Sequence, residues 1–362
     1  MSSPSPFSSW SRDVIAVGGH RGAHRVAIRA GISVAVPLIT IWALGHVEWS
    51  LYAAFGAFTA LYGRSSSPVN RLKMQSSAAV VLITSLLLGV VVATLPNPEW
   101  AVVVIAALWT MVVAAISDAL NWHPPGPLFA VFALCAVASV PVQSTSFRDA
   151  ALVSIASALF SILVGFVGHS RSERRSTSAP VGPALPTVRQ RFSGRDEWFL
   201  LLRFGVAAGA AGTISTALHI GHPYWAIVAA IVPISAVSMS HSLVRATHRV
   251  IGTFLGLILA WAILAFEPSG LVGIIIVVAL QVGAELFVGR NYALALICVT
   301  PLALVMIALA HPVGVTALIE DRAIETALGT AVALGVVLLS WLARGRARAG
   351  FRMVGNGWMT GA

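Results

Sequence analysis

Long apolar runs separated by short polar stretches fill the chain from residue 23 to residue 343. Most runs approach the roughly 20 helical residues that a bilayer core requires. They are continuous, whereas the strands of a membrane barrel alternate apolar and polar positions. The pattern therefore predicts an all-α, polytopic membrane protein.

Twelve segments meet this length criterion, in two groups of six. The first group covers about 25–46, 49–63, 74–95, 99–119, 127–142 and 148–168. The second group covers about 197–219, 223–240, 247–266, 270–288, 291–310 and 320–342. The predicted organisation is a tail at 1–22, a six-helix unit at 23–168, a linker at 169–196, a second six-helix unit at 197–343 and a tail at 344–362. The polar start of the chain does not resemble a cleaved signal peptide.

The two groups of six match each other at charged and aromatic positions. His46 and Trp49 recur 176 residues later as His222 and Trp225. Three arginine pairs, at offsets of 174, 178 and 174 residues, are Arg29 with Arg203, Arg71 with Arg249, and Arg148 with Arg322. Since six is an even number, two such copies point the same way across a membrane. The matches predict two parallel repeats related by an axis along the membrane normal.

Composition supports a membrane protein. The chain is 57% hydrophobic and 10% charged, with a mean hydropathy of +0.87, whereas a soluble domain is roughly 25% charged. The net charge of +10 comes from basic residues that stand between the apolar runs, so it indicates membrane topology and not nucleic-acid binding. Nineteen of the 23 Lys and Arg lie on the cytoplasmic side if both termini and the linker are cytoplasmic. We therefore expect a multi-pass protein of the inner (plasma) membrane in that orientation.

Catalytic and metal-binding motifs are not apparent in the sequence. No stretch resembles a nucleotide-binding loop, a metal-ligand cluster or a nucleophile elbow. Cys135 and Cys298 lie in apolar runs, which argues against a disulfide framework or a zinc site. We expect neither enzyme activity nor a cofactor or metal. The expected surroundings are the lipid bilayer, and a homo-oligomer is compatible with the sequence.

Ionisable residues inside spanning segments cost ~2.5–3.5 kcal/mol on insertion scales, so they are candidates for function. Arg29 and Arg203 lie about one turn into the first helix of each unit, where they either snorkel to the headgroups or line a cavity between the repeats. Arg148 and Arg322 are expected at the N-terminus of a helix, where the helix dipole disfavours a cation. They form either a surface ion-pair cluster with nearby acids or an external gate on an anion path.

Arg71 and Arg249 begin the third helix of each unit. Both are either positive-inside anchors or part of a substrate path. Gly252 and Gly256 follow Arg249 four residues apart, and such a pair lets another helix backbone approach closely. The sequence therefore predicts that Arg249 lies at a tight helix crossing.

Acidic and aromatic residues supply further candidates. Asp118 and Glu285, near the inner ends of the fourth and tenth segments, are either interfacial acids or groups that couple transport to protons. His222, Tyr224 and Trp225, like His46 and Trp49 in the first unit, are expected to anchor the chain in an aromatic belt at the membrane surface.

The second unit carries a set of motifs that resembles a known family. The motifs are Tyr224-Trp225, His248-Arg249 with Gly252-Thr253 and Gly256, Arg290-Asn291-Tyr292, and Arg322 with Glu325-Thr326 and Gly329. Over about residues 200–340 this set resembles the fusaric acid resistance family, which includes aromatic carboxylic acid exporters and is distantly related to plant aluminium-activated malate transporters. The first unit is similar only loosely, because Leu72 and Lys73 follow Arg71, and Phe129 stands at the position of Tyr292.

The resemblance implies efflux of small, aromatic organic anions along an arginine-lined path between the two units. Arg249 and Arg322 would contact or gate the substrate, with Arg71 and Arg148 as their partners. Two alternatives remain open from the residues alone. One is a passive anion channel that is independent of a proton gradient. The other is a non-transporting scaffold or accessory subunit whose arginine-rich linker binds a partner.

Overall fold

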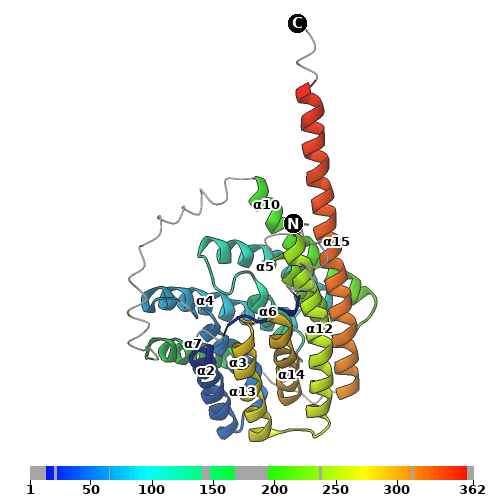
Figure 1. The fold of residues 1–362 in the computed structure, drawn as a ribbon. Coiled ribbons are helices and arrows are strands. Elements are labelled where there is room, and N and C mark those ends of the chain that lie inside the picture. The colour runs from blue at the N-terminus through cyan, green and yellow to red at the C-terminus, as the bar shows by residue number, and fades with distance from the viewer. Residues whose placement is uncertain are drawn as a thin grey trace.

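The computed structural model describes residues 14–19, 23–64, 66–140, 147–167, 195–235, 239–310 and 314–356 (Figure 1). Within these ranges the regular elements are helices. The first half contains α2 (Ala23–Ala43), α3 (Ser50–Ala57), α4 (Pro68–Ala93), α5 (Pro98–Ala119), α6 (Leu128–Ala138) and α7 (Phe147–Val167), and the 3₁₀ turns η1 (Val47–Trp49) and η2 (Phe58–Leu61) flank α3. The second half contains α10 (Arg195–Ala217), α11 (Tyr224–Ile234), α12 (Met239–Leu264), α13 (Gly270–Phe287), α14 (Tyr292–Ala310) and α15 (Val315–Asn356).

Nine helices in the described part of the chain are long and apolar enough to cross a membrane. The remaining three, α3, α6 and α11, have 8, 11 and 11 residues. At 1.5 Å per residue an 11-residue helix covers about 16 Å, roughly half of a bilayer core. Each of the twelve predicted segments therefore falls on a helix, but only nine helices of the described residues are long enough to span, so the predicted count of twelve is not confirmed.

Several helix boundaries differ from the sequence prediction. Helix α4 begins at Pro68 and not at residue 74, because Ser67 caps its first turn and a proline suits the first helical position. Helix α15 continues past residue 343 as far as Asn356, so most of the predicted C-terminal tail is helical. The predicted linker at 169–196 lies outside the described residues apart from its last two, and of the predicted N-terminal tail only 14–19 is described.

Corresponding helices in the two halves make corresponding contacts. Helix α3 packs on α7 as α11 packs on α15, and α4 packs on α6 as α12 packs on α14. The first helix of each half packs along the other half: α2 lies along α13, and α10 lies along α5. In Figure 1 α4, α5 and α7 run horizontally, whereas α2, α12, α13 and α15 run from top to bottom. The two halves thus meet through their first helices, each of which also packs against its own half.

Apolar side chains cover the outer faces of the helices. On α5 the exposed residues Val104, Leu108 and Val112 are spaced four apart, and Leu159 and Leu163 of α7 are exposed in the same way. Residues four apart share one face of a helix. Contiguous apolar faces of this kind are unfavourable in water and suit contact with lipid.

Candidate functional site

Arg249 lies within α12 with 2% of its surface exposed. Its Nη1 donates a hydrogen bond of 3.1 Å to the hydroxyl of Tyr292, the first residue of α14. Its Nε and Nη2 atoms are buried and have no hydrogen-bond partner among the described residues. These two nitrogens share one edge of the guanidinium, and such an edge can donate two parallel bonds to one carboxylate. The geometry leaves that edge available to an anion.

Two glycines of α12 bring α14 close to Arg249. A Cβ added at Gly252 would lie 2.5 Å from the carbonyl oxygen of Ala293, and one added at Gly256 would lie 2.9 Å from that of Leu296. Side chains cannot occupy such gaps, so the helices approach closely only because both positions are glycine. The predicted tight helix crossing at Arg249 is confirmed, and it brings Tyr292 within reach of the guanidinium.

Arg322 is also buried, and its guanidinium carbon lies 3.7 Å from the centroid of the Trp225 ring. A desolvated contact between a cation and an indole contributes about 2 kcal/mol. The Nε and Nη1 atoms of Arg322 have no partner among the described residues. Gly329, two turns further along α15, permits the approach of α11, because a Cβ there would collide with the carbonyl oxygen of Ala226.

Two expectations about this region are wrong. Trp225 and Tyr224 are 0% and 3% exposed, so they do not anchor the chain in an aromatic belt. They are buried because Arg322 covers one side of the indole and Phe132 of α6 packs 5.0 Å from it, measured between ring centroids. Arg322 also lies two turns inside α15, which starts at Val315, so it does not stand at the helix N-terminus where the dipole is strongest.

Glu325 lies one turn from Arg322 on α15 and is fully buried. Its Oε1 accepts a hydrogen bond of 2.9 Å from the hydroxyl of Ser215 on α10, while its Oε2 has no partner among the described residues. Four buried threonine hydroxyls are likewise without a partner in the described part: Thr253, Thr300, Thr326 and Thr330, on α12, α14 and α15. The interior between these helices is polar and incompletely hydrogen-bonded.

Arg249 and Arg322 approach each other from opposite ends of two packed helices. Helices α12 and α15 lie side by side and run in opposite directions (Figure 1). Arg249 is ten residues from the start of α12 and Arg322 is seven from the start of α15, which is about 15 Å and about 10 Å along the helices. The charge of Arg249 acts on Arg322. We call the group Ser215, Trp225, Arg249, Tyr292, Arg322 and Glu325 the arginine cluster.

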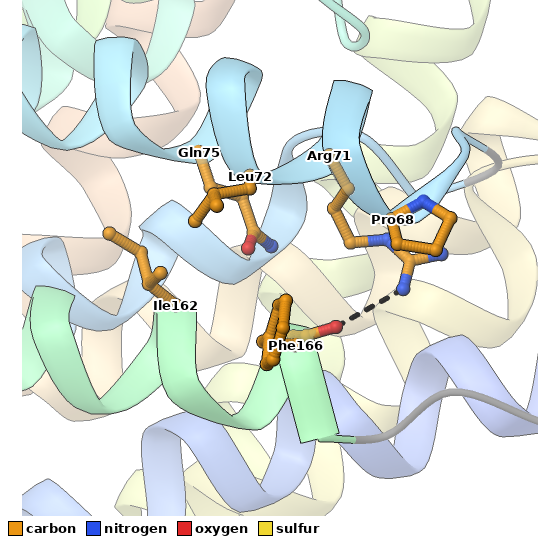
Figure 2. Close-up of a pocket in the computed structure, with 7 residues that line it drawn as sticks. Pro68, Arg71, Leu72, Gln75, Ile162 and Phe166 are labelled. Atoms are coloured by element: carbon orange, nitrogen blue, oxygen red, sulfur yellow. Dashed lines mark hydrogen bonds between the residues drawn. The ribbon is translucent and has the colours of Figure 1, made fainter.

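Arg71, the expected counterpart of Arg249, has a different environment. It is 2% exposed, and its Nε, Nη1 and Nη2 donate to the backbone carbonyls of Gly63, Gly165 and Ser66 at 3.1, 3.2 and 3.1 Å. Figure 2 shows Arg71 beside Pro68, Leu72 and Gln75 of α4, with its bond to the end of α7 as a dashed line. Because each guanidinium nitrogen has a backbone acceptor, Arg71 joins α4 to α7 and the preceding loop.

Arg29 and Glu285 meet at the contact between α2 and α13, together with Arg64. The Nη2 of Arg64 lies 2.7 Å from the Oε2 of Glu285 and 3.0 Å from its carbonyl oxygen. Arg29, 6% exposed, donates to the carbonyl oxygen of Arg64 at 3.5 Å, and its charge also acts on Glu285. This ion pair joins the two halves of the chain. Asp118, the expected counterpart of Glu285, is exposed on α5.

Arg148 and Arg203 do not join the arginine cluster on the contacts described. Arg148 is exposed and is the second residue of α7, whereas Arg322 is buried two turns inside its helix. Arg203 is half-buried on α10. Asp321, next to Arg322, accepts from the Nδ1 of His222 at 2.7 Å, so this acid has a partner other than Arg322.

The N-terminal segment 14–19 contacts α12 at His248, nine residues after the start of that helix, and α14 at its start. His248 Nε2 lies 2.9 Å from the carbonyl oxygen of Val14, and Asn291 Nδ2 donates to the carbonyls of Val14 and Ala16 at 3.1 and 3.0 Å. Arg290 and Gly18 exchange two further hydrogen bonds, of 3.0 and 2.9 Å. This N-terminal strap is held by the immediate chain neighbours of Arg249 and Tyr292.

The described structure also contains a hollow away from the arginine cluster. An apolar hollow of about 370 Å³ lies between α2 and α7, lined by residues that include Pro37, Trp49 and Phe160. Among the described residues, no group of three or more His, Cys, Asp or Glu is placed to hold a metal ion.

Four residues that the structure places at these sites have no such role in the sequence prediction. The sequence predicts Trp225 at the membrane surface, gives Glu325 and Tyr292 no role beyond the family motifs, and does not single out Arg64. The motifs that contain Trp225, Tyr292 and Glu325 are the available signal for three of the four.

Comparison with known proteins finds a family match in the second half of the chain. Residues 210–336 match the family described as fusaric acid resistance protein-like. The match contains α11 to α14 and all members of the arginine cluster, and it confirms the resemblance drawn from the motifs. The "Uncharacterized membrane protein YvaC" of Bacillus subtilis (strain 168) is 33% identical over 141 residues.

The alignment with YvaC covers 39% of this chain and 22% of the relative, so the chain spans about a fifth of the length of that relative. No solved structure matches the chain. Its apolar helices and its family match together establish that the chain is a multi-pass membrane protein.

Proposed function

We propose that this protein is a transmembrane transporter that exports small organic anions, and that Arg249 and Arg322 bind the anion. The unpartnered Nε–Nη2 edge of buried Arg249 carries the proposal. A buried donor without a partner costs roughly 1–3 kcal/mol, and more when it is charged. That cost is recovered when a carboxylate accepts both bonds. The cluster holds two arginines against one glutamate, and this excess of positive charge suits a monovalent anion.

Aromatic carboxylates are the proposed substrate class. Tyr292 and Trp225 stand directly against the two guanidinium groups, so a carboxylate held there would bring its ring next to aromatic faces. Offset or edge-on contacts between aromatic rings contribute about 0.5–1.5 kcal/mol beyond the area they bury. An aromatic acid would therefore bind more tightly than an aliphatic acid of similar size.

The path is proposed to run beside the contact between the halves. Trp225 packs against Phe132, so one wall of the cluster belongs to the first half. The matched helix contacts and the matched arginines support two parallel copies of one unit. Because both arginines are 2% exposed, an anion reaches them only when the helices around them move. The placement of the basic residues supports cytoplasmic termini in the inner membrane.

The test is counterflow in proteoliposomes that contain the purified full-length chain. Vesicles loaded with unlabelled benzoate should accumulate labelled benzoate, and Arg249→Ala should lower the initial rate at least tenfold, since removing one partner of a buried charge pair costs about 2–5 kcal/mol. Arg249→Lys should also be impaired, because an ammonium group cannot chelate both carboxylate oxygens. Lys73→Ala, which removes an exposed charge on α4, is the matched control.

The same assay separates the alternatives. Wild-type counterflow in Arg249→Ala would remove Arg249 from the site. A passive channel would give voltage-dependent anion currents without exchange acceleration. A scaffold would show no flux with any carboxylate, and its function would depend on residues 172–194.

A further inference from the structure

Glu325 is a buried carboxylate that the proposed transport step leaves without a role. It is 0% exposed and lies within the arginine cluster. Ser215 donates to its Oε1 at 2.9 Å, and its Oε2 has no partner in the described part of the chain. One turn earlier on the same helix, the Nε and Nη1 of Arg322 are also without partners. A buried acceptor and a buried cation thus stand close together without a complete hydrogen-bond network.

Each helix packed against Glu325 contributes a definite set of polar groups. From α15 itself come Arg322 and Asp321, from α10 comes Ser215, and from α11 come Tyr224 and Trp225. On α12 and α14, Arg249 and Tyr292 act on Arg322. Asp321 is bonded to His222 at 2.7 Å. Within the described residues, Glu325 is therefore the carboxylate of the arginine cluster, and no cation donates a hydrogen bond to it.

We propose that Glu325 binds a proton when Arg322 and Arg249 bind the anion, so that proton and anion occupy the cluster together. This inference rests on the proposed function. With Glu325 ionised, its charge offsets Arg322 and repels an entering carboxylate. When one proton from water binds the Glu325 carboxylate, the two arginine charges are left for the anion. The O–H bond that forms on Glu325 replaces the one that breaks in the hydronium ion that donates the proton.

Electrostatics determine the direction of the coupling. Two unit charges in near contact interact strongly at the effective dielectric constant of a partly buried site, so the charge of Glu325 strongly affects an anion bound next to it. Linkage between two binding events is reciprocal. The proton therefore strengthens anion binding, and the anion strengthens proton binding by the same factor. The two ions move in the same direction, and a monovalent anion crosses without net charge.

Glu285 and Asp118, which the sequence favoured as proton-coupling groups, are placed differently. Glu285 already has a cationic partner, because it pairs with Arg64 at 2.7 Å on α13. Asp118 is exposed on α5. Neither is a member of the arginine cluster, so we expect a proton on either to leave the charge that Arg322 and Arg249 present unchanged.

The test measures benzoate binding to the purified full-length chain by calorimetry, between about pH 6 and pH 8.5. Benzoate itself stays ionised over this range, so any proton uptake belongs to the protein. Titrations in two buffers with different protonation enthalpies count the protons taken up. The wild type should take up about one proton per benzoate on the alkaline side, and its Kd should rise by up to about tenfold per pH unit there. Glu325→Gln should take up none and keep the low-pH affinity at every pH.

Two further variants make the result specific. Glu320→Gln changes an exposed acid on the same helix and should behave as the wild type. Ser215→Ala removes one hydrogen bond from the ionised carboxylate, so it should move the midpoint of the pH dependence upward by up to about one pH unit without abolishing it. This second variant keeps the test informative if Glu325→Gln fails to fold.

The possible results separate the two proposals. Proton uptake that persists in Glu325→Gln, or that disappears in Glu285→Gln alone, overturns the role of Glu325 and leaves the anion site intact. Benzoate binding by the wild type that does not vary with pH does the same. If the wild type binds no benzoate at any pH, the proposed function fails, and the coupling fails with it.

Discussion

The guanidinium carbon of Arg322 lies 3.7 Å from the centroid of the Trp225 ring, inside the protein and not at its surface. The indole face occupies one side of the guanidinium plane, which leaves the N–H groups at its edge to bind other partners. Trp225 is the second residue of the 11-residue helix α11, and this helix is buried along its whole length in the described structure. A buried charge such as that of Arg322 costs several kcal/mol in lipid. The indole of Trp225 offsets part of this cost through its contact with the guanidinium, although it carries no charge.

Removing the indole should lower both stability and anion binding. Trp225→Leu deletes a contact of about 2 kcal/mol and opens space next to Arg322, so the melting temperature in detergent and the benzoate affinity should both fall. Trp225→Phe keeps an aromatic face and should retain much of both. Trp100→Leu, on an exposed position of α5, provides the control. If Trp225→Leu binds benzoate as the wild type does, the stack does not orient Arg322.

Tyr292→Phe tests how Arg249 is oriented. The variant removes the hydroxyl that accepts from Nη1 at 3.1 Å and leaves the ring in place. A hydrogen bond to a charged donor contributes about 1.5 kcal/mol, so benzoate affinity should fall roughly tenfold while the fold persists. The same substitution at Tyr62, whose ring packs against Trp122 in the first half, should leave the affinity unchanged. Equal affinities for Tyr292→Phe and the wild type would contradict this account.

Gly252→Ala should destabilise the protein by forcing α12 away from α14. The added Cβ would lie 2.5 Å from a backbone oxygen and 2.7 Å from the Cβ of Leu296, and overpacking of this kind costs about 1–3 kcal/mol. Gly335→Ala is the matched control, because a Cβ at that position of α15 meets nothing within 4 Å. Thermal unfolding in detergent should separate the two variants by several degrees, with Gly252→Ala the lower. Coincident melting curves would mean that the helices can separate without cost.

The helices themselves could be predicted from the sequence because lipid demands long continuous apolar runs. Each predicted segment falls on a helix for this reason. The sequence does not predict the start of α4 because its first two turns contain Arg71 and Lys73, and a hydropathy pattern assigns charged residues to a loop. The sequence predicts spans at α3, α6 and α11 because the apolar runs there are longer than the helices of 8, 11 and 11 residues that they contain. Hydropathy alone does not show where an apolar run stops being helical.

The site could be predicted only in part. Arg249 and Arg322 stood out individually, since charges within apolar segments are rare. Their partners did not, because contacts between α11 and α15 join residues about 100 positions apart. The apparent equivalence of Arg71 and Arg249 also concealed a difference: the donors of Arg71 bind backbone carbonyls, whereas one edge of Arg249 binds none among the described residues. A matched residue in a repeat preserves position along the chain but not the surrounding acceptors.

The N-terminal strap offers a test of the region next to Arg249. Asn291 has two separable roles: its Oδ1 accepts from the backbone N–H groups of Ala293 and Leu294 at the start of α14, and its Nδ2 donates to the strap. Asn291→Asp keeps the acceptor, which suits a helix N-cap, and removes the donor. The carboxylate would also repel the carbonyl oxygens of Val14 and Ala16.

In Asn291→Asp the strap should detach while α14 stays folded. The amide of Gly18, which donates to the carbonyl oxygen of Arg290 at 2.9 Å, should exchange its hydrogen about tenfold faster than in the wild type, as expected for the loss of roughly 1–2 kcal/mol of hydrogen bonding. The amides of α14 should keep their wild-type exchange rates. Asn291→Ala loses both roles, so it should accelerate exchange in the strap and in the first turn of α14 together. Unchanged exchange at Gly18 in Asn291→Asp would show that His248 and Arg290 hold the strap without Asn291.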